Sequence, residues 1–333
     1  MTEERPADPA DPADRADGTG SPSEVPRAAP GTSGHYGEDL FEPAHPREAE
    51  RIDDAAVVYD PVTTGRLRAL GAGPGQRCLE IGAGTGTVAR WLLTEGGAAE
   101  VVAVDRDTSA LAGLAASLDP GPAPPSGAAA RLRVALADVT DPASLDSALG
   151  SDRFDLVHAR FVLMHLPERR RVLAGLAARL APGGLLLLGD AVDPAAGAAS
   201  GGSTPSDPNP APDSDPAAPS AYRRTMDAMW RALRATIGTD IGPVTRYPRF
   251  LHEEGLVGVG AELYCPPLVP GGPLAEFWRA TWQRMRPALE ERGGVDPTTV
   301  DEALAVLAAP ATPSSPGPAE LGPGMLLAWG RRP

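Results

Sequence analysis

The stretch that decides the fold of this chain is LEIGAGTG, at residues 79–86. Its first residues are mostly apolar and suit a short buried strand, with a carboxylate, Glu80, near the end. Three glycines, Gly82, Gly84 and Gly86, then lead into the helical pattern TVARWLL. Glycine is needed in such a turn because a Cβ would block a close approach and because the turn often requires a positive φ. A strand, a glycine turn and a helix in this order predict a place where the backbone meets a nucleotide-like ligand at a helix N-terminus.

The spacing of these glycines separates two classes of ligand. A dinucleotide-binding turn reads G-x-G-x-x-G, with its third glycine five positions after the first. Here that position is Thr87, and the glycines alternate instead. Glu80 stands just before the turn, where it would repel a pyrophosphate but would accept a cationic ligand. The remaining interpretation is a structural turn that binds no ligand.

Two more apolar runs end in a carboxylate. Residues 100–105 end at Asp105, which follows Gly86 by 19 positions, and residues 132–138 end at Asp138. An acid at the end of the second strand of a doubly wound sheet binds ribose hydroxyls. Either acid alone could be a helix N-cap or a solvated loop residue. Acids at the ends of three successive strands favour a ligand site.

Together these motifs resemble those of the class I S-adenosylmethionine (SAM)-dependent methyltransferases, and in particular the actinobacterial type-11/type-12 grouping. The resemblance covers about residues 47–333; it is specific in the first half and loose over 191–320. It implies that Asp105 holds the ribose hydroxyls of SAM and that Asp138 receives the adenine amino group. The full set of cofactor contacts that it implies is Glu80, Gly82, Ala83, Gly84, Gly86, Asp105, Arg106, Asp138, Val139, Ala159, Arg160, Arg51 and Tyr59.

The order of the predicted elements is typical of an α/β protein with a doubly wound, mostly parallel seven-stranded sheet. This is the Rossmann-like plan of the class I methyltransferases, here with N-terminal helices and a late helical cap. The predicted strands cover residues 78–81, 100–105, 132–138, 154–159, 185–190, 257–268 and 325–330.

The N-terminal part divides into a tail and a lid. Residues 1–34 consist mainly of Pro, Asp, Ala, Ser and Gly, so a disordered acidic tail is expected. Residues 35–70 are expected to form a helical lid, with one helix at 47–59 and a second at 62–70.

Residues 71–333 are expected to form the methyltransferase domain. Residues 193–220 are rich in Pro, Ala, Ser, Gly and Asp and are expected to be a disordered insertion. The segments 221–254 and 274–308 have helical patterns and are expected to build the cap.

Composition excludes several classes of protein. The chain has 333 residues and a net charge of −14, and residues 1–60 carry 15 acidic residues and 5 arginines, so the acidity belongs mostly to the tail. No basic patch with interleaved aromatic residues is visible, so we expect no nucleic-acid partner. No apolar run approaches the roughly 20 residues that cross a membrane, and the N-terminus has no apolar signal region. Cys78 and Cys265, both expected in buried strands, are too few for a disulfide framework, so a cytoplasmic location is expected.

The segment after the fourth predicted strand holds further candidates. The resemblance places Ala159 and Arg160 beside the methionine part of SAM, where a backbone carbonyl would accept from the ammonium group. Arg160 would pair either with Glu80 or with the SAM carboxylate. His165 lies in Met-His-Leu-Pro and is a candidate general base, because imidazole titrates near neutral pH. The alternative is a histidine that packs this loop and hydrogen-bonds the backbone.

Aromatic and basic residues of the lid and the cap are weaker candidates. Arg51 would meet the SAM carboxylate, and Tyr59 or Tyr36 would face the sulfonium through a cation–π contact. Trp278 and Trp282 are one helical turn apart and would line an acceptor pocket. For all of these residues the alternative is ordinary helix packing.

The resemblance implies transfer of a methyl group from SAM to an oxygen or nitrogen of a small molecule or peptide, in secondary metabolism. No group of His, Cys and Asp has metal-ligand spacing, so metal-dependent transfer is not expected. The late helices could equally form a homodimer interface. Two other functions stay open: a nicotinamide-dependent oxidoreductase on the same fold, and a non-catalytic SAM-binding interaction protein.

Overall fold

The computed structural model describes residues 40–42, 45–118, 127–128, 131–194, 219–309 and 321–333. All of them belong to the compact unit Ser33–Pro333. The expected tail, Tyr36 and nearly all of the expected insertion lie outside the described residues.

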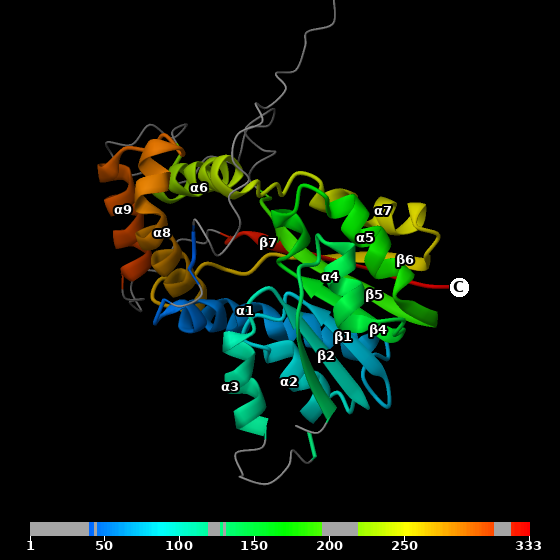
Figure 1. The fold of residues 1–333 in the computed structure, drawn as a ribbon. Coiled ribbons are helices and arrows are strands. Elements are labelled where there is room, and N and C mark those ends of the chain that lie inside the picture. The colour runs from blue at the N-terminus through cyan, green and yellow to red at the C-terminus, as the bar shows by residue number, and fades with distance from the viewer. Residues whose placement is uncertain (1–39, 43–44, 119–126, 129–130, 195–218, 310–320) are drawn as a thin grey trace, which may run out of the picture. The chain divides into compact units, whose positions relative to one another are not determined.

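Seven strands form one sheet in the order β3-β2-β1-β4-β5-β7-β6 (Figure 1). The strands are β1 (Arg77–Ile81), β2 (Glu100–Asp105), β3 (Leu132–Leu136), β4 (Phe154–Arg160), β5 (Leu180–Val192), β6 (Val257–Tyr264) and β7 (Gly324–Arg331). The first five pair in parallel, and β7 runs antiparallel to both β5 and β6. The expected doubly wound sheet is therefore confirmed. Its strand order reverses at β1, and in such sheets ligands bind outside the carboxyl ends of the strands at this switch point.

Successive side chains of the central strands alternate between two cores, because neighbouring residues of a strand point to opposite faces. Cys78 of β1 belongs to one core, and Leu79 and Ile81 belong to the other. The first core is covered by α1 (Glu48–Ala69), α2 (Thr87–Thr94) and α3 (Ser109–Leu118). The second is covered by α4 (Pro142–Leu149), α5 (Arg169–Ala178) and α7 (Tyr247–Glu253). Burial on both faces explains why these strands read as nearly continuous apolar runs.

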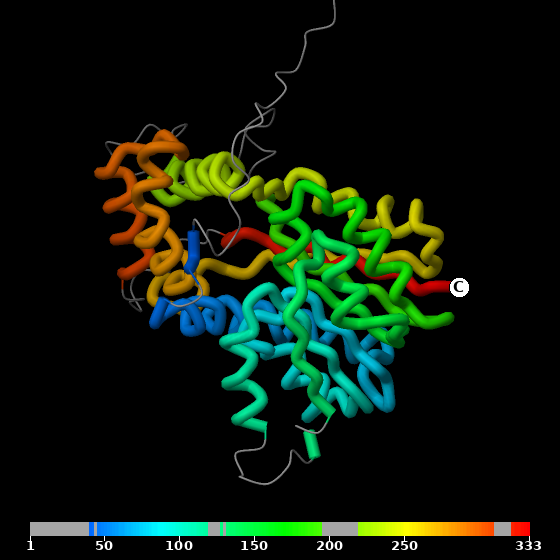
Figure 2. The backbone as a smooth tube through the Cα atoms, in the orientation of Figure 1, coloured from blue at the N-terminus to red at the C-terminus, as the bar shows by residue number. Residues whose placement is uncertain are grey.

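Three helices pack against one another to form a cap, at the left of Figure 1: α6 (Ala221–Ile237), α8 (Pro273–Glu291) and α9 (Pro297–Ala308). The chain leaves the sheet twice to build it, once for α6 and again for α8 and α9 before it returns as β7 (Figure 2). Two of the helices begin at side-chain caps, since Ser220 accepts from Arg223 N and Asp296 accepts from Thr299 N. Because α8 also packs against α1, the cap and the N-terminal helix are joined.

One helix, α1, replaces the two that the sequence predicts at 47–59 and 62–70. The prediction separated them because proline removes a backbone donor and usually ends a helix. Pro61 instead lies inside α1, where Thr63 and Thr64 donate their hydroxyls to carbonyls four residues back. Buried residues on both sides of Pro61, Tyr59 and Leu67 among them, hold the helix against the core and outweigh the lost bond.

Other differences are small. β3 ends at Leu136, so Asp138 lies in the following loop rather than in the strand. β6 ends at Tyr264, and Cys265 just beyond it is only partly buried, so the expectation of a buried strand position is correct for Cys78 and wrong for Cys265.

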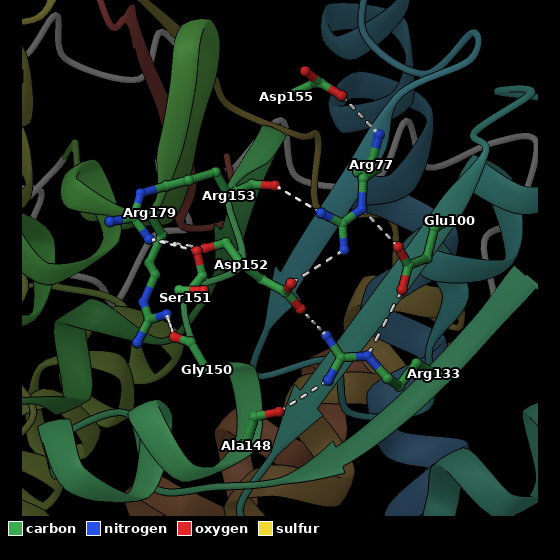
Figure 3. Close-up of polar contacts among 10 residues, drawn as sticks. All are labelled: Arg77, Glu100, Arg133, Ala148, Gly150, Ser151, Asp152, Arg153, Asp155 and Arg179. Carbon is green, nitrogen blue, oxygen red and sulfur yellow. Dashed lines mark hydrogen bonds and ion pairs between the residues drawn. The ribbon is translucent and has the colours of Figure 1, made fainter.

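A ring of four charges ties together the amino ends of the strands (Figure 3). Arg77 Nε donates to Glu100 at 2.8 Å, and Arg133 donates to Asp152 at 2.7 Å. Weaker pairs close the ring, Arg77 with Asp152 at 3.5 Å and Arg133 with Glu100 at 3.7 Å. The ring is balanced in charge and partly exposed, so water screens it. It fixes the edge of the sheet that lies opposite the site described next.

None of the described helices combines the length and the apolar character that a membrane-spanning helix needs.

Candidate active site

A cavity of about 780 Å³ lies at the carboxyl ends of β1 to β4 and extends under α1, α6 and α8. Most of the predicted site residues line it, and they reach it from distant parts of the chain. The predicted residues that line the cavity are Arg51, Tyr59, Glu80, Gly82, Ala83, Gly84, Asp105, Arg106, Asp138, Val139, Arg160, His165 and Trp278.

Two residues expected to contact the cofactor are not among those that line the cavity, and their contacts stay a prediction. Gly86 is the N-cap of α2 with a φ of 77°, and a Cβ there would run into Leu111 and Leu114, so this glycine serves the packing of α2 against α3. Ala159 is buried in β4 and belongs to the core on the other face of the sheet.

The glycine turn presents its backbone to the cavity. Gly82 and Gly84 have φ values of 64° and 57°, in the left-handed region that favours glycine. Gly82 N and Ala83 N both donate to Val104 O of β2, at 2.8 and 3.1 Å, which fixes the start of the turn. At Gly84 a Cβ would meet only Ile52 of α1, at 3.8 Å, so the backbone is open to a ligand here.

The two other strand-end acids are held firmly by local bonds. Asp105 accepts from Gly84 N at 2.8 Å and from Asp107 N at 3.1 Å. The acid at the end of β2 is thereby joined to the glycine turn. Asp138 accepts from the backbone N–H of Thr140 at 2.8 Å and from its hydroxyl at 2.7 Å. Both carboxylates are thus oriented before any ligand arrives.

Glu80 is the most unusual group in the cavity. Its side chain is buried, and Oε2 has no hydrogen-bond partner among the described residues. Burial raises its pKa to about 8, although the nearby charge of Arg160 opposes the shift. The unpartnered oxygen favours a ligand that brings a donor, and a cationic donor most of all.

His158 lies next to Glu80 across the β1–β4 pair and is not among the residues predicted from the sequence. It is fully buried, and its Nδ1 is 3.9 Å from Glu80 Oε1, beyond hydrogen-bond distance. Burial, and the charge of Arg160, lower its pKa to about 3, so the ring is neutral at pH 7. The sequence signal that could have found it is a lone histidine within an apolar strand.

Arg160 does not pair with Glu80, and its expected contact with the SAM carboxylate stays a prediction. Its guanidinium donates to Asp60 Oδ1 at 2.5 Å and to Thr63 Oγ1 at 3.1 Å, both on α1. The sequence pattern did not predict Asp60 as the partner of Arg160. The ion pair fastens α1 to the end of β4 and leaves Arg160 close enough to influence the pKa of Glu80.

Phe161, next along the chain, is strained. Its φ of 55° is rare for a bulky residue, and its backbone N–H is held by Gly189 O at 2.7 Å. Its ring meets the edge of the Tyr59 ring, with centroids 5.1 Å apart. Strain of this kind is concentrated at functional sites, and Phe161 lines the cavity.

The two lid candidates are bound to other parts of the protein. Tyr59 donates its hydroxyl to Pro323 O at 2.8 Å, and its ring lines the cavity. Arg51 is buried and donates to both carboxylate oxygens of Glu48, at 3.0 and 2.5 Å, and to Thr281 Oγ1 at 3.3 Å. Arg51 thus already has a counter-charge and joins α1 to α8.

His165 lies on the 3₁₀ turn Leu163–His165 at the cavity wall. Its Nδ1 is 2.8 Å from Thr239 Oγ1. Burial, with the charges of Arg51 and Arg169, lowers its pKa to about 3. The imidazole is therefore neutral at pH 7 and is a weak base.

Asp190, at the end of β5, holds this turn in place and was missed as a site residue. It accepts from Val162 N at 2.9 Å and from Met164 N at 3.1 Å, and Tyr247 donates its hydroxyl at 2.5 Å. Burial raises its pKa to about 7. The signal was present in the sequence, because the apolar run 185–190 ends in an acid as the first runs do.

The cap closes the cavity with apolar side chains. Met229, Trp230 and Leu233 come from α6, and Phe277 and Trp278 come from α8.

The structure separates the two candidate tryptophans of α8. Trp278 lines the cavity. Trp282 is fully buried in the core, where its Nε1 is 3.3 Å from Met229 Sδ.

Residues 79–186 match the family model of a methyltransferase domain. The matched segment holds the glycine turn, all three strand-end acids, Arg160 and His165. These residues carry a methyltransferase domain. Methyltransferase str3 of Strobilurus tenacellus is 32% identical to it over 143 residues, which are 43% of this chain and 45% of that protein. The chain therefore matches less than half the length of this relative.

Two solved structures are similar to this chain. One, from Galdieria sulphuraria, is assigned as a sarcosine dimethylglycine methyltransferase; it is 15% identical, with a TM-score of 0.49, and the match covers 89% of this chain and 93% of that one. The other, a methyltransferase structure from Bacillus halodurans, is 15% identical with a TM-score of 0.44 over 81% and 98% of the two chains. At these values neither structure bears on the substrate.

The cavity of the methyltransferase domain fits SAM. The unpartnered oxygen of buried Glu80 would accept from the ammonium, and the open backbone at Gly84 admits a ligand between the acids. Asp105 and Asp138 would accept from the ribose hydroxyls and the adenine amino group. Within the described part of the chain, no three His, Cys, Asp or Glu side chains are grouped so that they could hold a metal ion.

Proposed function

We propose that this chain transfers a methyl group from SAM to an oxygen or nitrogen of a small molecule or peptide, in secondary metabolism. The observation that carries the proposal is the convergence of Glu80, Asp105 and Asp138 on one cavity around a left-handed glycine turn. The apolar residues of the cap form a second wall of the same cavity, apart from the strand-end acids. This wall supports the proposal that the cavity also binds the methyl acceptor.

SAM, when bound, would supply a methyl group on a positively charged sulfur. The acceptor oxygen or nitrogen would form a bond to the methyl carbon as the methyl–sulfur bond breaks, and S-adenosylhomocysteine would be the leaving group. The chain contributes mainly by binding and by alignment, which can lower the barrier by about 7–11 kcal/mol. Glu80 would hold the ammonium, Asp105 the ribose and Asp138 the adenine. The Arg160–Asp60 pair would keep α1 over the ligand and exclude water.

His165 would orient the acceptor rather than remove its proton. A neutral imidazole can accept a hydrogen bond from a hydroxyl or amino group, but a pKa of about 3 leaves it little capacity to hold a proton at pH 7. The tentative catalytic role of His165 therefore becomes a positioning role in this proposal. An amine that is neutral before transfer, or a readily ionised hydroxyl, needs no stronger base.

The proposal is tested by transfer assays with an acceptor panel, in which methylated product is detected by mass, and by titration of SAM into an Asp105→Ala variant. Loss of the carboxylate removes hydrogen bonds to a charged group, each of which contributes about 1.5–3 kcal/mol, so SAM affinity should fall about ten- to hundred-fold. Asp155→Ala is the matched control, because Asp155 accepts from Arg77 N at the opposite edge of the sheet. Unchanged affinity in Asp105→Ala would contradict the assignment of this site.

We further propose that the protein works in the cytoplasm, with the unpaired thiols of Cys78 and Cys265 as support. A homodimer through the cap helices is likewise a proposal, and sedimentation would test it.

A further inference from the structure

The cap half of the cavity has an aromatic wall, formed by Trp230, Phe277 and Trp278. Trp278 is at its centre: its ring centroid is 4.6 Å from that of Phe277 and 6.5 Å from that of Trp230, and both neighbours are inclined steeply to it. Edge-to-face contacts of this kind hold large rings rigidly. The wall is therefore a fixed surface on which a flat, apolar molecule can pack.

No charged side chain comes from the cap to this half of the cavity within the described residues. Met229 and Leu233 complete the wall beside the three rings, and the one polar side chain that α8 adds, Thr281, accepts from Arg51. Arg51 borders the wall and is paired with Glu48, which also pairs with Arg284 of α8. Moving a charged group from water into such surroundings is unfavourable, so the wall selects against charge on the part of the ligand that packs there.

The wall nevertheless contains one hydrogen-bond donor. Trp278 Nε1 is buried and has no acceptor among the described residues, although the side chain lines the cavity and is 6% exposed. Buried donors in native proteins almost always have a partner, because an unmade bond is costly. A ligand oxygen at this position would supply it.

We propose that the methyl acceptor is an uncharged aromatic molecule that packs on Trp230, Phe277 and Trp278 and accepts a hydrogen bond from Trp278 Nε1 through a carbonyl oxygen. This inference rests on the proposed function, since it names the acceptor class of the same cavity. It assigns Trp278 as the residue that selects the acceptor.

Three naphthols that differ in one substituent test the proposal: 6-hydroxy-2-acetonaphthone carries a carbonyl group, 6-ethyl-2-naphthol lacks it, and 6-hydroxy-2-naphthoate is charged. Each is titrated calorimetrically into the full chain saturated with S-adenosylhomocysteine. The ketone should bind most tightly and the carboxylate most weakly. Trp278→Phe keeps a ring but removes the N–H, so the affinity for the ketone should fall about five-fold while that for the ethyl compound changes little.

Trp282→Phe is the matched control, because it makes the same change one turn along α8, in the core. It should preserve the preference for the ketone. If Trp278→Phe also preserves that preference, or if the naphthoate binds as tightly as the ketone, the inference is wrong. If S-adenosylhomocysteine binds but no naphthol does, the inference is wrong and the proposed function is not affected. If S-adenosylhomocysteine does not bind, the proposed function fails and the inference with it.

Discussion

At the scale of the residue, Glu80 joins two properties that rarely occur together. It is buried without a hydrogen-bond donor for Oε2 among the described residues, and it lines a cavity large enough for a cofactor. Burial raises its pKa to about 8, so most of the free protein carries a neutral carboxyl at pH 7. A bound ammonium group would favour the ionised form, and Glu80 would then lose its proton.

Binding of SAM or S-adenosylhomocysteine at pH 7 should therefore release close to one proton. Because the proton must leave as the ligand binds, affinity should increase as pH rises from 6 towards 8, by at most about ten-fold per pH unit. Calorimetric titration in two buffers of different ionisation enthalpy measures the release. Glu80→Gln should abolish it, and Glu100→Gln at the opposite edge of the sheet should not. Equal heats in both buffers would show that Glu80 does not titrate on binding.

At the scale of the element, α1 lines one side of the cavity, where we propose that it acts as a lid. Three of the contacts that fasten it lie near the cavity: Asp53 accepts from Thr85 Oγ1 of the glycine turn at 2.7 Å, Asp60 pairs with Arg160, and Tyr59 donates to Pro323 O. The bond between Thr85 and Asp53 is exposed. A ligand that enters the cavity beside the glycine turn would have to break this bond.

Asp53→Ala should loosen α1 over the glycine turn. A single exposed hydrogen bond contributes about 0.5–1.5 kcal/mol, so the affinity for S-adenosylhomocysteine should fall about two- to ten-fold. Hydrogen exchange of the amides in the first half of α1 should become faster. The neighbouring substitution Asp54→Ala, which removes a carboxyl that faces Glu276 instead, serves as the control. Equal effects of the two changes would mean that the bond to Thr85 does not hold the lid.

The elements also show where sequence patterns stop being informative. Most strands and helices could be predicted to within a few residues, because their apolar periodicity is local. The continuity of α1 through Pro61 could not, since it depends on burial against distant elements. Trp278 and Trp282 have the same local pattern, and only the packing of α8 against α6 decides that one lines the cavity and the other fills the core.

At the scale of the whole molecule, the sheet order and the convergence of Glu80, Asp105 and Asp138 could be predicted, because acids at the carboxyl ends of parallel strands meet at one edge. The partners of Arg160 and Arg51 could not be predicted, since Asp60 and Glu48 lie on a helix whose placement the sequence does not reveal. The role of Asp190 could not be predicted either, because it depends on the conformation of the turn whose backbone N–H groups Asp190 binds.

The most direct test is calorimetric titration of the full chain with SAM and, separately, with NADH. The glycine spacing, the buried carboxyl of Glu80 and the two outer acids predict that SAM binds at one site per chain. NADH should not bind, because the glycines at 82, 84 and 86 do not have the spacing of a dinucleotide-binding turn. Binding of NADH without binding of SAM would contradict the assignment of this cavity and would return the oxidoreductase interpretation to first place.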